Sequence, residues 1–176
     1  MSPLLPVSAL PVPVPTPAPR PLRLGFLALT DAAPLAVAAH LGLFAHYGLR
    51  VELRREIGWA TIREKIIYGE LDAAHAPAPM LWSTHLGLGC PAAEVLTALV
   101  LNLHGNAVTF SRALWEAGAR DAASLHALAK ERRARQPLTF GIVYHFSTHH
   151  LMLRDWLLAA GLNPEQVVDY LARHPE

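Results

Sequence analysis

Three side chains that donate hydrogen bonds lie where short apolar runs give way to helix-like patterns. Trp59, in Gly58-Trp59-Ala60-Thr61, offers an indole N–H that donates and cannot accept. Thr148 and His149, which follow Ser147, add a hydroxyl and a ring N–H. A helix N-terminus presents unpaired backbone N–H groups and about half a positive charge, so such corners are typical of sites for a small anion.

Each of these residues also has a simpler structural explanation. Trp59 could be a packing residue, and His149 could cap a helix or lie on the surface. Asp31 is most simply the N-cap of the helix that follows it, and Ser147 the N-cap of its own helix. The residue types by themselves therefore leave packing and anion binding open.

The ten histidines and the single cysteine raise two other kinds of site. His145 and His149 have i,i+4 spacing, but Ser147 predicts a helix start between them, which breaks the one-face geometry that two metal ligands need. No Glu between them could act as a metalloprotease base. Cys90 lies in a loop without a nearby base, and there is no Gly-rich phosphate loop. We therefore expect no metal ion, no cofactor and no catalytic residue, which indicates a binding protein rather than an enzyme.

Short strand patterns alternate with helical patterns, which predicts an α/β fold with a mostly parallel sheet covered on both faces. The expected strands cover Leu22–Leu29, Leu49–Arg55, Leu71–Ala74, Glu94–Asn102, Asn106–Phe110 and Leu138–Val143. In such sheets ligands bind beyond the carboxyl ends of the strands, beside helix N-termini. Three corners of this kind carry polar or aromatic residues: Thr30–Asp31, Gly58–Thr61 and Ser147–His149.

Two of the expected helices bear on these corners. In the helix from Trp59 to Tyr68, isoleucines at positions 62, 66 and 67 predict the buried face, and the charged run Arg63–Lys65 is expected outside. A second helix runs from Ser147 to Ala160, and Pro164 opens a last helical piece.

The composition is typical of a globular domain with little net charge. Of the 176 residues, 52% are hydrophobic and 16% are charged, and the formal net charge is +1. Direct nucleic acid binding is therefore not expected. Residues 1–21 hold eight of the fifteen prolines and predict a disordered tail rather than an export signal. No apolar run inside the domain reaches the roughly 18 residues that span a bilayer. We therefore expect a cytoplasmic protein, or a periplasmic one if an export signal lies upstream of Met1.

Five blocks of the sequence carry a resemblance to a known family: Leu24–Pro34, Gly58–Lys65, Leu71–Met80, Leu101–Val108 and Ser147–Pro164. In this order they resemble the nitrate- and bicarbonate-binding proteins of ABC importers, which are NMT1-like proteins, and their cytoplasmic relatives, the nitrate/nitrite sensors. This resemblance implies a two-lobed, periplasmic-binding-protein-like (type II) fold that closes on an oxyanion. Family members are much longer, so the chain resembles their N-terminal part, with a tail over 1–21, a first lobe over 22–103 and the start of a second lobe over 104–176.

The resemblance also implies which residues bind the ligand. Trp59 and His149 match the family's ligand-contacting Trp and His, and Thr148 adjoins His149. Asn106 stands where the nitrate binders carry a Gln in a Gly-Gln-Ala-Ile pattern. Its shorter amide leaves room for a larger anion or a bridging water. The sequence after Pro164 departs from the strand that the family shows there.

The resemblance implies that the protein binds a small inorganic oxyanion, nitrate or nitrite. We interpret it as a cytoplasmic nitrate sensor, whose partner in this family would be an RNA-binding antiterminator. The first alternative is the solute-binding component of an ABC importer for nitrate or bicarbonate, with an ABC permease as its partner. The second is an enzyme like the related pyrimidine synthases, which use a histidine and a cysteine-rich run, and the isolated Cys90 argues against it.

Overall fold

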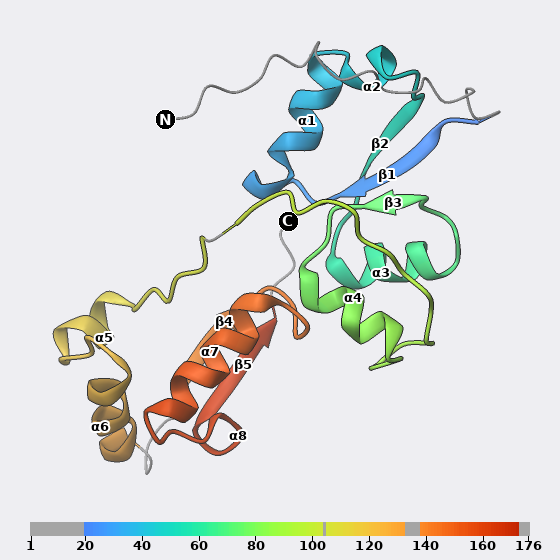
Figure 1. The fold of residues 1–176 in the computed structure, drawn as a ribbon. Coiled ribbons are helices and arrows are strands. Elements are labelled where there is room, and N and C mark those ends of the chain that lie inside the picture. The colour runs from blue at the N-terminus through green and yellow to red at the C-terminus, as the bar shows by residue number, and fades with distance from the viewer. Residues whose placement is uncertain (1–19, 104, 133–137, 173–176) are drawn as a thin grey trace.

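The computed structural model describes residues 20–103, 105–132 and 138–172, which form two parallel sheets with helices around them (Figure 1). The first sheet has the strand order β2-β1-β3, and the second has the order β4-β5. The recorded strand pairings are all parallel. The predicted α/β class with parallel strands is therefore confirmed. Most of the predicted tail lies outside the described residues, and the lobe boundary at 103/104 stays a prediction.

Strand β1 (Leu22–Phe26) is the centre of the first sheet because both of its edges are paired. On one edge it runs in register with β2 (Val51–Arg55), and on the other it meets the short β3 (Ala73–Ala74). Gly25 lies close to Leu71: a Cβ at position 25 would lie 2.5 Å from Cδ1 of Leu71, and that side chain would have to move. The three strands point the same way, so the residues that follow them meet at one edge of the sheet.

Helices follow or precede each of these strands. The 3-10 turn η2 (Thr30–Ala32) and α1 (Ala33–His40) follow β1, and α2 (Leu43–His46) leads into β2. Helix α3 (Trp59–Ile67) follows β2, and α4 (Ala78–His85) follows β3. Figure 1 shows α1 and α2 on one side of the sheet and α3 and α4 on the other. The core here consists of Leu27, Trp59, Ile62 and Met80.

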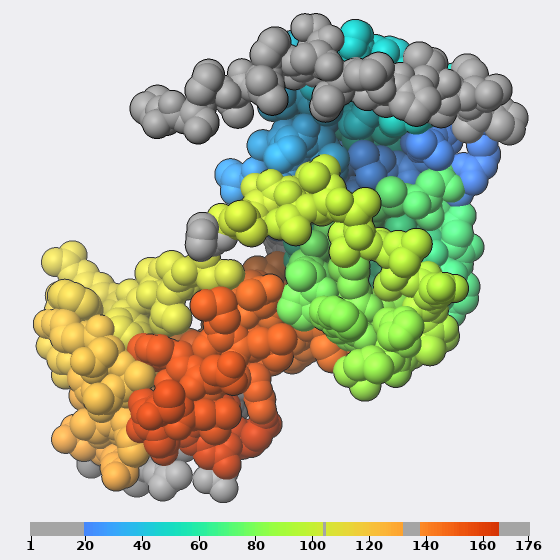
Figure 2. All heavy atoms as spheres, in the orientation of Figure 1, coloured from blue at the N-terminus to red at the C-terminus, as the bar shows by residue number. Residues whose placement is uncertain are grey.

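Residues 91–103 and 105–110 cross from α4 to α5 (Arg112–Glu116) as extended chain without strand pairing (yellow-green in Figures 1 and 2). The strands predicted over Glu94–Asn102 and Asn106–Phe110 are therefore wrong. A strand needs a neighbour for its backbone N–H and C=O groups, and in the described part of the chain neither sheet includes this segment. Its apolar side chains are correspondingly exposed, 92% for Leu96 and 77% for Leu103.

The second sheet consists of β4 (Leu138–Ile142) and β5 (Val168–Ala172). The helices of this part of the chain are α6 (Ala122–Arg132), α7 (Thr148–Ala159) and α8 (Pro164–Val167). Strands β4 and β5 pair in register along their whole length. The expected departure from a strand after Pro164 is therefore wrong. Helix α8 ends after one turn, and the edge of β4 then supplies backbone partners for β5. No helix in the described ranges is both long enough and apolar enough to cross a membrane.

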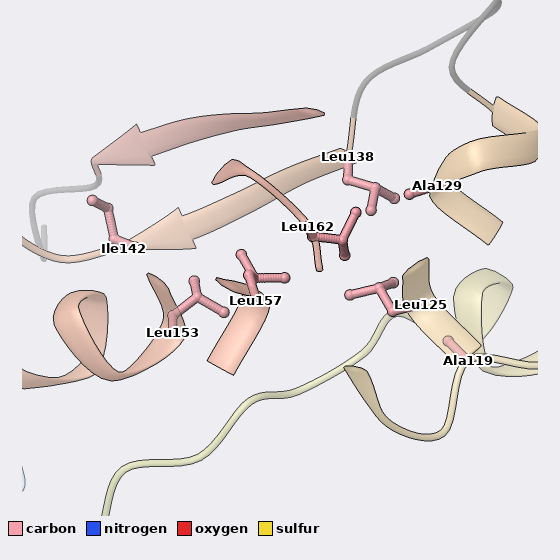
Figure 3. Close-up of a cluster of buried hydrophobic side chains, with 8 residues drawn as sticks. All are labelled: Ala119, Leu125, Ala129, Leu138, Ile142, Leu153, Leu157 and Leu162. Atoms are coloured by element: carbon pink, nitrogen blue, oxygen red, sulfur yellow. The ribbon is translucent and has the colours of Figure 1, made fainter. Parts of the chain in front are cut away.

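A second hydrophobic core holds α6 and α7 against β4. Figure 3 shows its side chains gathered between these elements, with Ala119 from the chain before α6 and Leu162 from the chain after α7. Its members are Ala119, Leu125, Ala129, Leu138, Ile142, Leu153, Leu157 and Leu162. Each fully buried leucine contributes about 1.5–3 kcal/mol to folding, so this cluster fixes where α7 begins relative to the end of β4.

Leu157 and Leu158 provide a matched pair of tests for this core. Leu157 is fully buried, whereas Leu158 is 51% exposed. Leu157→Ala should lower the free energy of unfolding by about 2–5 kcal/mol, because it removes buried methyl groups and leaves a cavity. Leu158→Ala should lower it by less than about 1 kcal/mol. Urea unfolding followed by circular dichroism measures both, and equal losses would contradict the described packing of α7.

Candidate functional site

The carboxyl ends of β1, β2 and β3 bring together Asp31, Trp59 and His75. Trp59 is the first residue of α3, and its side chain is only 4% exposed. Its ring lies 4.9 Å from the ring of His75, centroid to centroid, in an edge-on arrangement with an interplanar angle of 64°. Among the described residues, no hydrogen bond to the indole N–H is recorded. The packing and ligand interpretations of Trp59 are therefore compatible, since its faces pack while its N–H stays available.

His75 is held by a carboxylate. It is 5% exposed, and its Nε2 lies 3.1 Å from Oδ2 of Asp31. The other ring nitrogen, Nδ1, and the other carboxylate oxygen, Oδ1, are buried and have no hydrogen-bond partner within the described ranges. Buried polar atoms usually find partners, so an unpaired nitrogen and an unpaired oxygen mark this strand edge as a candidate site.

The predicted N-cap role of Asp31 is wrong. Asp31 lies inside the turn η2, whose N-cap is Leu29, and no side-chain cap is recorded there. The carboxylate turns instead toward His75, because β3 places that imidazole at the adjacent strand end. The Asp31 carbonyl oxygen accepts a hydrogen bond of 2.6 Å from the side-chain amide of Asn102 on the crossing segment.

His149 closes the turn between β4 and α7. The Val143 backbone N–H donates to His149 Nε2 over 3.2 Å, and the Ser147 hydroxyl lies 3.0 Å from the same nitrogen. Because a backbone N–H can only donate, Nε2 is the acceptor and the proton of the neutral ring sits on Nδ1. Burial lowers the pKa of His149 below its ordinary value, and the nearby His150 lowers it further. At neutral pH His149 is therefore an uncharged ring with an Nδ1–H donor.

The N-cap prediction for Ser147 is confirmed. Its hydroxyl oxygen accepts a hydrogen bond of 3.4 Å from the His150 backbone N–H, and α7 begins at the next residue, Thr148. His145 therefore lies outside the helix, as expected. Within the described ranges, no group of three or more His, Cys, Asp or Glu side chains is placed to hold a metal ion.

The two other predicted site residues lie near the start of α7. Thr148 is exposed at its first position. The Asn106 side-chain amide lies 3.8 Å from the sulfur of Met152, one turn further along the helix. The structure thus gathers Asn106, Thr148 and His149 around the first turns of α7.

In the described part of the chain, Trp59 is connected to this group through the turn after β4. Val143 and Tyr144 pack against the core that contains Trp59, and Val143 also binds His149 through its backbone N–H. In the described part of the chain, no direct contact between Trp59 and His149 is recorded. The four predicted residues therefore form two groups on either side of Val143.

A cavity of about 270 Å³ lies between residues 107–111, β4 and α7. Of the described residues that line it, His149 alone can titrate. Neither Trp59 nor Asn106 lines this cavity, so it includes one predicted ligand residue and does not join the two groups.

Sequence reasoning missed the environments of Arg63 and His75. Arg63 was expected on the outside of its helix, but it is only 8% exposed. The spacing could have predicted this burial, because Trp59, Ile62, Arg63 and Ile66 follow the i, i+3, i+4, i+7 pattern of one helix face. His75 directly follows a strand, the position where polar residues of α/β sheets meet a ligand.

Comparison with known proteins decides the family. A model of the NMT1-like family matches residues 15–175. The chain belongs to this family. The structure of the periplasmic nitrate-binding protein NrtA from Synechocystis PCC 6803 superposes with a TM-score of 0.78 at 27% identity, over 88% of this chain and 41% of NrtA. The family resemblance and the periplasmic-binding-protein-like α/β fold are thereby confirmed.

Two curated relatives show the range of similarity. The bicarbonate transport ATP-binding protein CmpC of Synechocystis is 38% identical over 149 residues, which are 84% of this chain and 22% of CmpC. The nitrate/nitrite binding protein NrtA of Nostoc is 33% identical over 153 residues, 83% of this chain and 34% of that protein. The chain thus spans 22% to 41% of the length of these relatives and of the solved NrtA.

The lowered pKa of His149 predicts a pH dependence of stability. The unfolded chain takes up the proton near the ordinary value of 6.5, above the folded pKa, so protonation favours unfolding. The contribution of neutral His149 is complete above 6.5 and is lost as the pH falls through the folded pKa. His149→Gln keeps an acceptor for Val143 and cannot titrate, so it should lose less stability than the unmodified chain between about pH 7.5 and about pH 5.

Urea unfolding at both pH values measures this difference. His85→Gln, at an exposed histidine of α4, is the matched control and should behave like the unmodified chain. The same pH dependence in His149→Gln and in the unmodified chain would refute the assigned role of His149.

Proposed function

We propose that this chain binds a small inorganic oxyanion of the nitrate and bicarbonate class. The observation that carries the proposal is the state of His149. Its acceptor nitrogen is occupied by the Val143 amide, so the free nitrogen of the neutral ring presents a donor at the N-terminus of α7. Donors without an opposing negative charge suit an anion. The nitrate/nitrite binding by the NrtA proteins that the chain resembles supports the same proposal.

Trp59, Asn106, Thr148 and His149 are the proposed ligand-binding residues. Trp59 supplies an indole N–H, Thr148 a hydroxyl and Asn106 an amide. Among the described residues, the Asn106 amide has a recorded hydrogen bond only to a thioether sulfur, which is a weak acceptor, so the amide can turn to an anion at little cost. With two or three charge-assisted hydrogen bonds of about 1.5–3 kcal/mol each, less the cost of ordering, micromolar binding is within reach when the whole fold is present.

Among the anions, the donor-rich group favours nitrate and nitrite. Both ions accept hydrogen bonds and have no proton to donate, whereas bicarbonate also carries a hydroxyl that seeks an acceptor. The unpaired Oδ1 of Asp31 is such an acceptor, but Asp31 belongs to the edge of the first sheet and not to the group of Asn106, Thr148 and His149. Titrations with nitrate, nitrite and bicarbonate therefore rank the three ligands.

We propose that the protein senses the anion in the cytoplasm and acts on an importer. The alternative is that it is the solute-binding component of that importer. The ATP-binding proteins of nitrate and bicarbonate importers reach up to 39% identity with this chain, and the NrtA binding proteins reach up to 34%. Proteins that bind ATP act where ATP is, in the cytoplasm, which favours a cytoplasmic location. The structural match to a periplasmic binding protein supports the receptor alternative. In either role the partners would be importer subunits, and no observation supports an antiterminator.

An effect of the chain and nitrate on the ATPase rate of an importer's ATP-binding subunit would support the sensing role. No such effect, together with nitrate binding, would favour the receptor.

The proposal is one of binding rather than catalysis. The thiol of Cys90 lies 4.0 Å from the Ser83 carbonyl oxygen, and no described hydrogen bond joins it to a base. The candidate site offers a histidine, as the pyrimidine-synthase alternative would need, but the single Cys90 does not supply a cysteine-rich run.

Substitution of Trp59 tests the proposed site. Nuclear magnetic resonance of the chain during a nitrate titration should show a saturable shift of the Trp59 indole signal, and Trp59→Ala should weaken binding about tenfold or more. Trp82, which is 70% exposed on α4, is the matched control, and Trp82→Ala should leave the affinity unchanged. A parallel titration with sulfate measures whether the site distinguishes between oxyanions. The absence of any saturable shift with the three anions would refute binding by this chain, and unchanged affinity in Trp59→Ala would refute the site.

A further inference from the structure

Arg63 is a buried cation at the junction of three segments. It lies on α3 one turn after Trp59, and only 8% of it is exposed. Its Nη1 and Nη2 donate to the carbonyl oxygens of Leu88 and Gly89 over 3.3 and 3.1 Å. Its guanidinium carbon lies 5.8 Å from the ring centroids of both Tyr144 and Phe146. One side chain thus joins α3, the turn after α4 and the turn after β4.

All of these partners are uncharged. Within the described ranges, no carboxylate forms an ion pair with Arg63, whereas Lys65, two residues along the same helix, pairs with Glu56 over 2.7 Å. Burying a cation is costly unless its N–H groups are satisfied. Two carbonyl oxygens and two aromatic rings compensate part of that cost, because a guanidinium can donate hydrogen bonds and attract ring faces at once, whereas its buried Nε has no partner in the described part of the chain. This arrangement needs the shape of arginine and not only its charge.

The aromatic partners belong to the turn that holds His149. Tyr144 and Phe146 lie between Val143, whose N–H binds His149, and Ser147, which caps α7. Tyr144 also packs against the core that contains Trp59. The position of this turn on α3 therefore determines where the His149 donor lies relative to Trp59.

We propose that Arg63 is a positioning residue that clamps the Val143–Ser147 turn to helix α3 and so sets the place of His149 relative to Trp59. Its significance for ligand binding rests on the proposed anion site, but the clamp itself does not. Arg63 acts through Tyr144 and Phe146 rather than by touching the ligand.

Three variants test the clamp. Arg63→Met removes the charge and the planar group, and Arg63→Lys keeps the charge but cannot span two carbonyls and two rings. Arg54→Met is the matched control, since it removes one positive charge from an exposed side chain of β2 that pairs with Glu52. Phe146→Leu removes one aromatic face and keeps both carbonyl bonds, so it tests the clamp from the other side.

The readout does not depend on any anion. Hydrogen exchange of the Val143 amide should become about tenfold faster in both Arg63 variants and in Phe146→Leu, and should stay unchanged in Arg54→Met. The pH midpoint of the His149 ring signals should rise toward its ordinary value in the same three variants, with His150 intact in all of them. Unchanged exchange of the Glu56 amide, which donates to the Phe26 carbonyl oxygen over 2.8 Å in the first sheet, verifies folding.

Two results would overturn the clamp. The first is an Arg63→Lys variant whose Val143 exchange rate and His149 titration equal those of the unmodified chain, since only the charge of Arg63 would then matter. The second is a folded Arg63→Met variant whose Val143 exchange rate is unchanged. If Arg63→Met does not fold, Phe146→Leu decides by the same criteria. A nitrate titration is run in parallel. A loosened turn in a chain that never binds nitrate supports the clamp and refutes only the proposed function.

Discussion

Parallel pairing of β1 with β2 and β3 decides where the polar residues of the first sheet meet. Because β1 is paired on both edges and all three strands run the same way, the chain leaves each strand at the same edge. Asp31, Trp59 and His75 are far apart in sequence and are neighbours for this reason alone. A Cβ at Gly25 would lie 2.5 Å from Cδ1 of Leu71, so the glycine leaves room for this buried leucine beside β1. The geometry of this edge is therefore a property of the backbone, and the side chains fill positions that the pairing provides.

Charge is arranged differently on the two sides of Trp59. Toward η2, the Asp31 carboxylate would repel an anion, and the imidazole of His75 stands 3.1 Å from it as a partner. Toward the turn after β4, the Arg63 cation has only uncharged partners among the described residues. Charge is therefore divided across Trp59: negative charge is disfavoured toward η2 and favoured toward the turn after β4. This balance exists although the formal net charge of the whole chain is only +1.

The sequence was sufficient where local pattern decides the structure. Alternation and helix signals located β1, β2, α3, β4 and α7, and the rule for strand ends pointed to the corners that carry Trp59 and His149. It failed where a neighbour distant in sequence decides. Glu94–Asn102 reads as a strand by composition, but a strand exists only where another strand lies beside it. The sequence predicts Asp31 as a helix cap because it does not show that β3 places His75 next to it. It predicts Arg63 as a surface charge because it does not show that Tyr144 and Phe146 lie over its guanidinium.

The crossing segment is tied down by two amides that lie four residues apart. Asn102 donates to the Asp31 carbonyl oxygen over 2.6 Å, whereas Asn106 donates to the Met152 sulfur over 3.8 Å. A carbonyl oxygen is a strong acceptor and a thioether is a weak one, so the first tie holds the segment to the first sheet more firmly than the second holds it to α7. The weaker tie belongs to the residue proposed to bind the anion. An amide that exchanges a thioether for an oxyanion gains a charge-assisted hydrogen bond and loses little, so ligand binding would strengthen the connection between the crossing segment and α7.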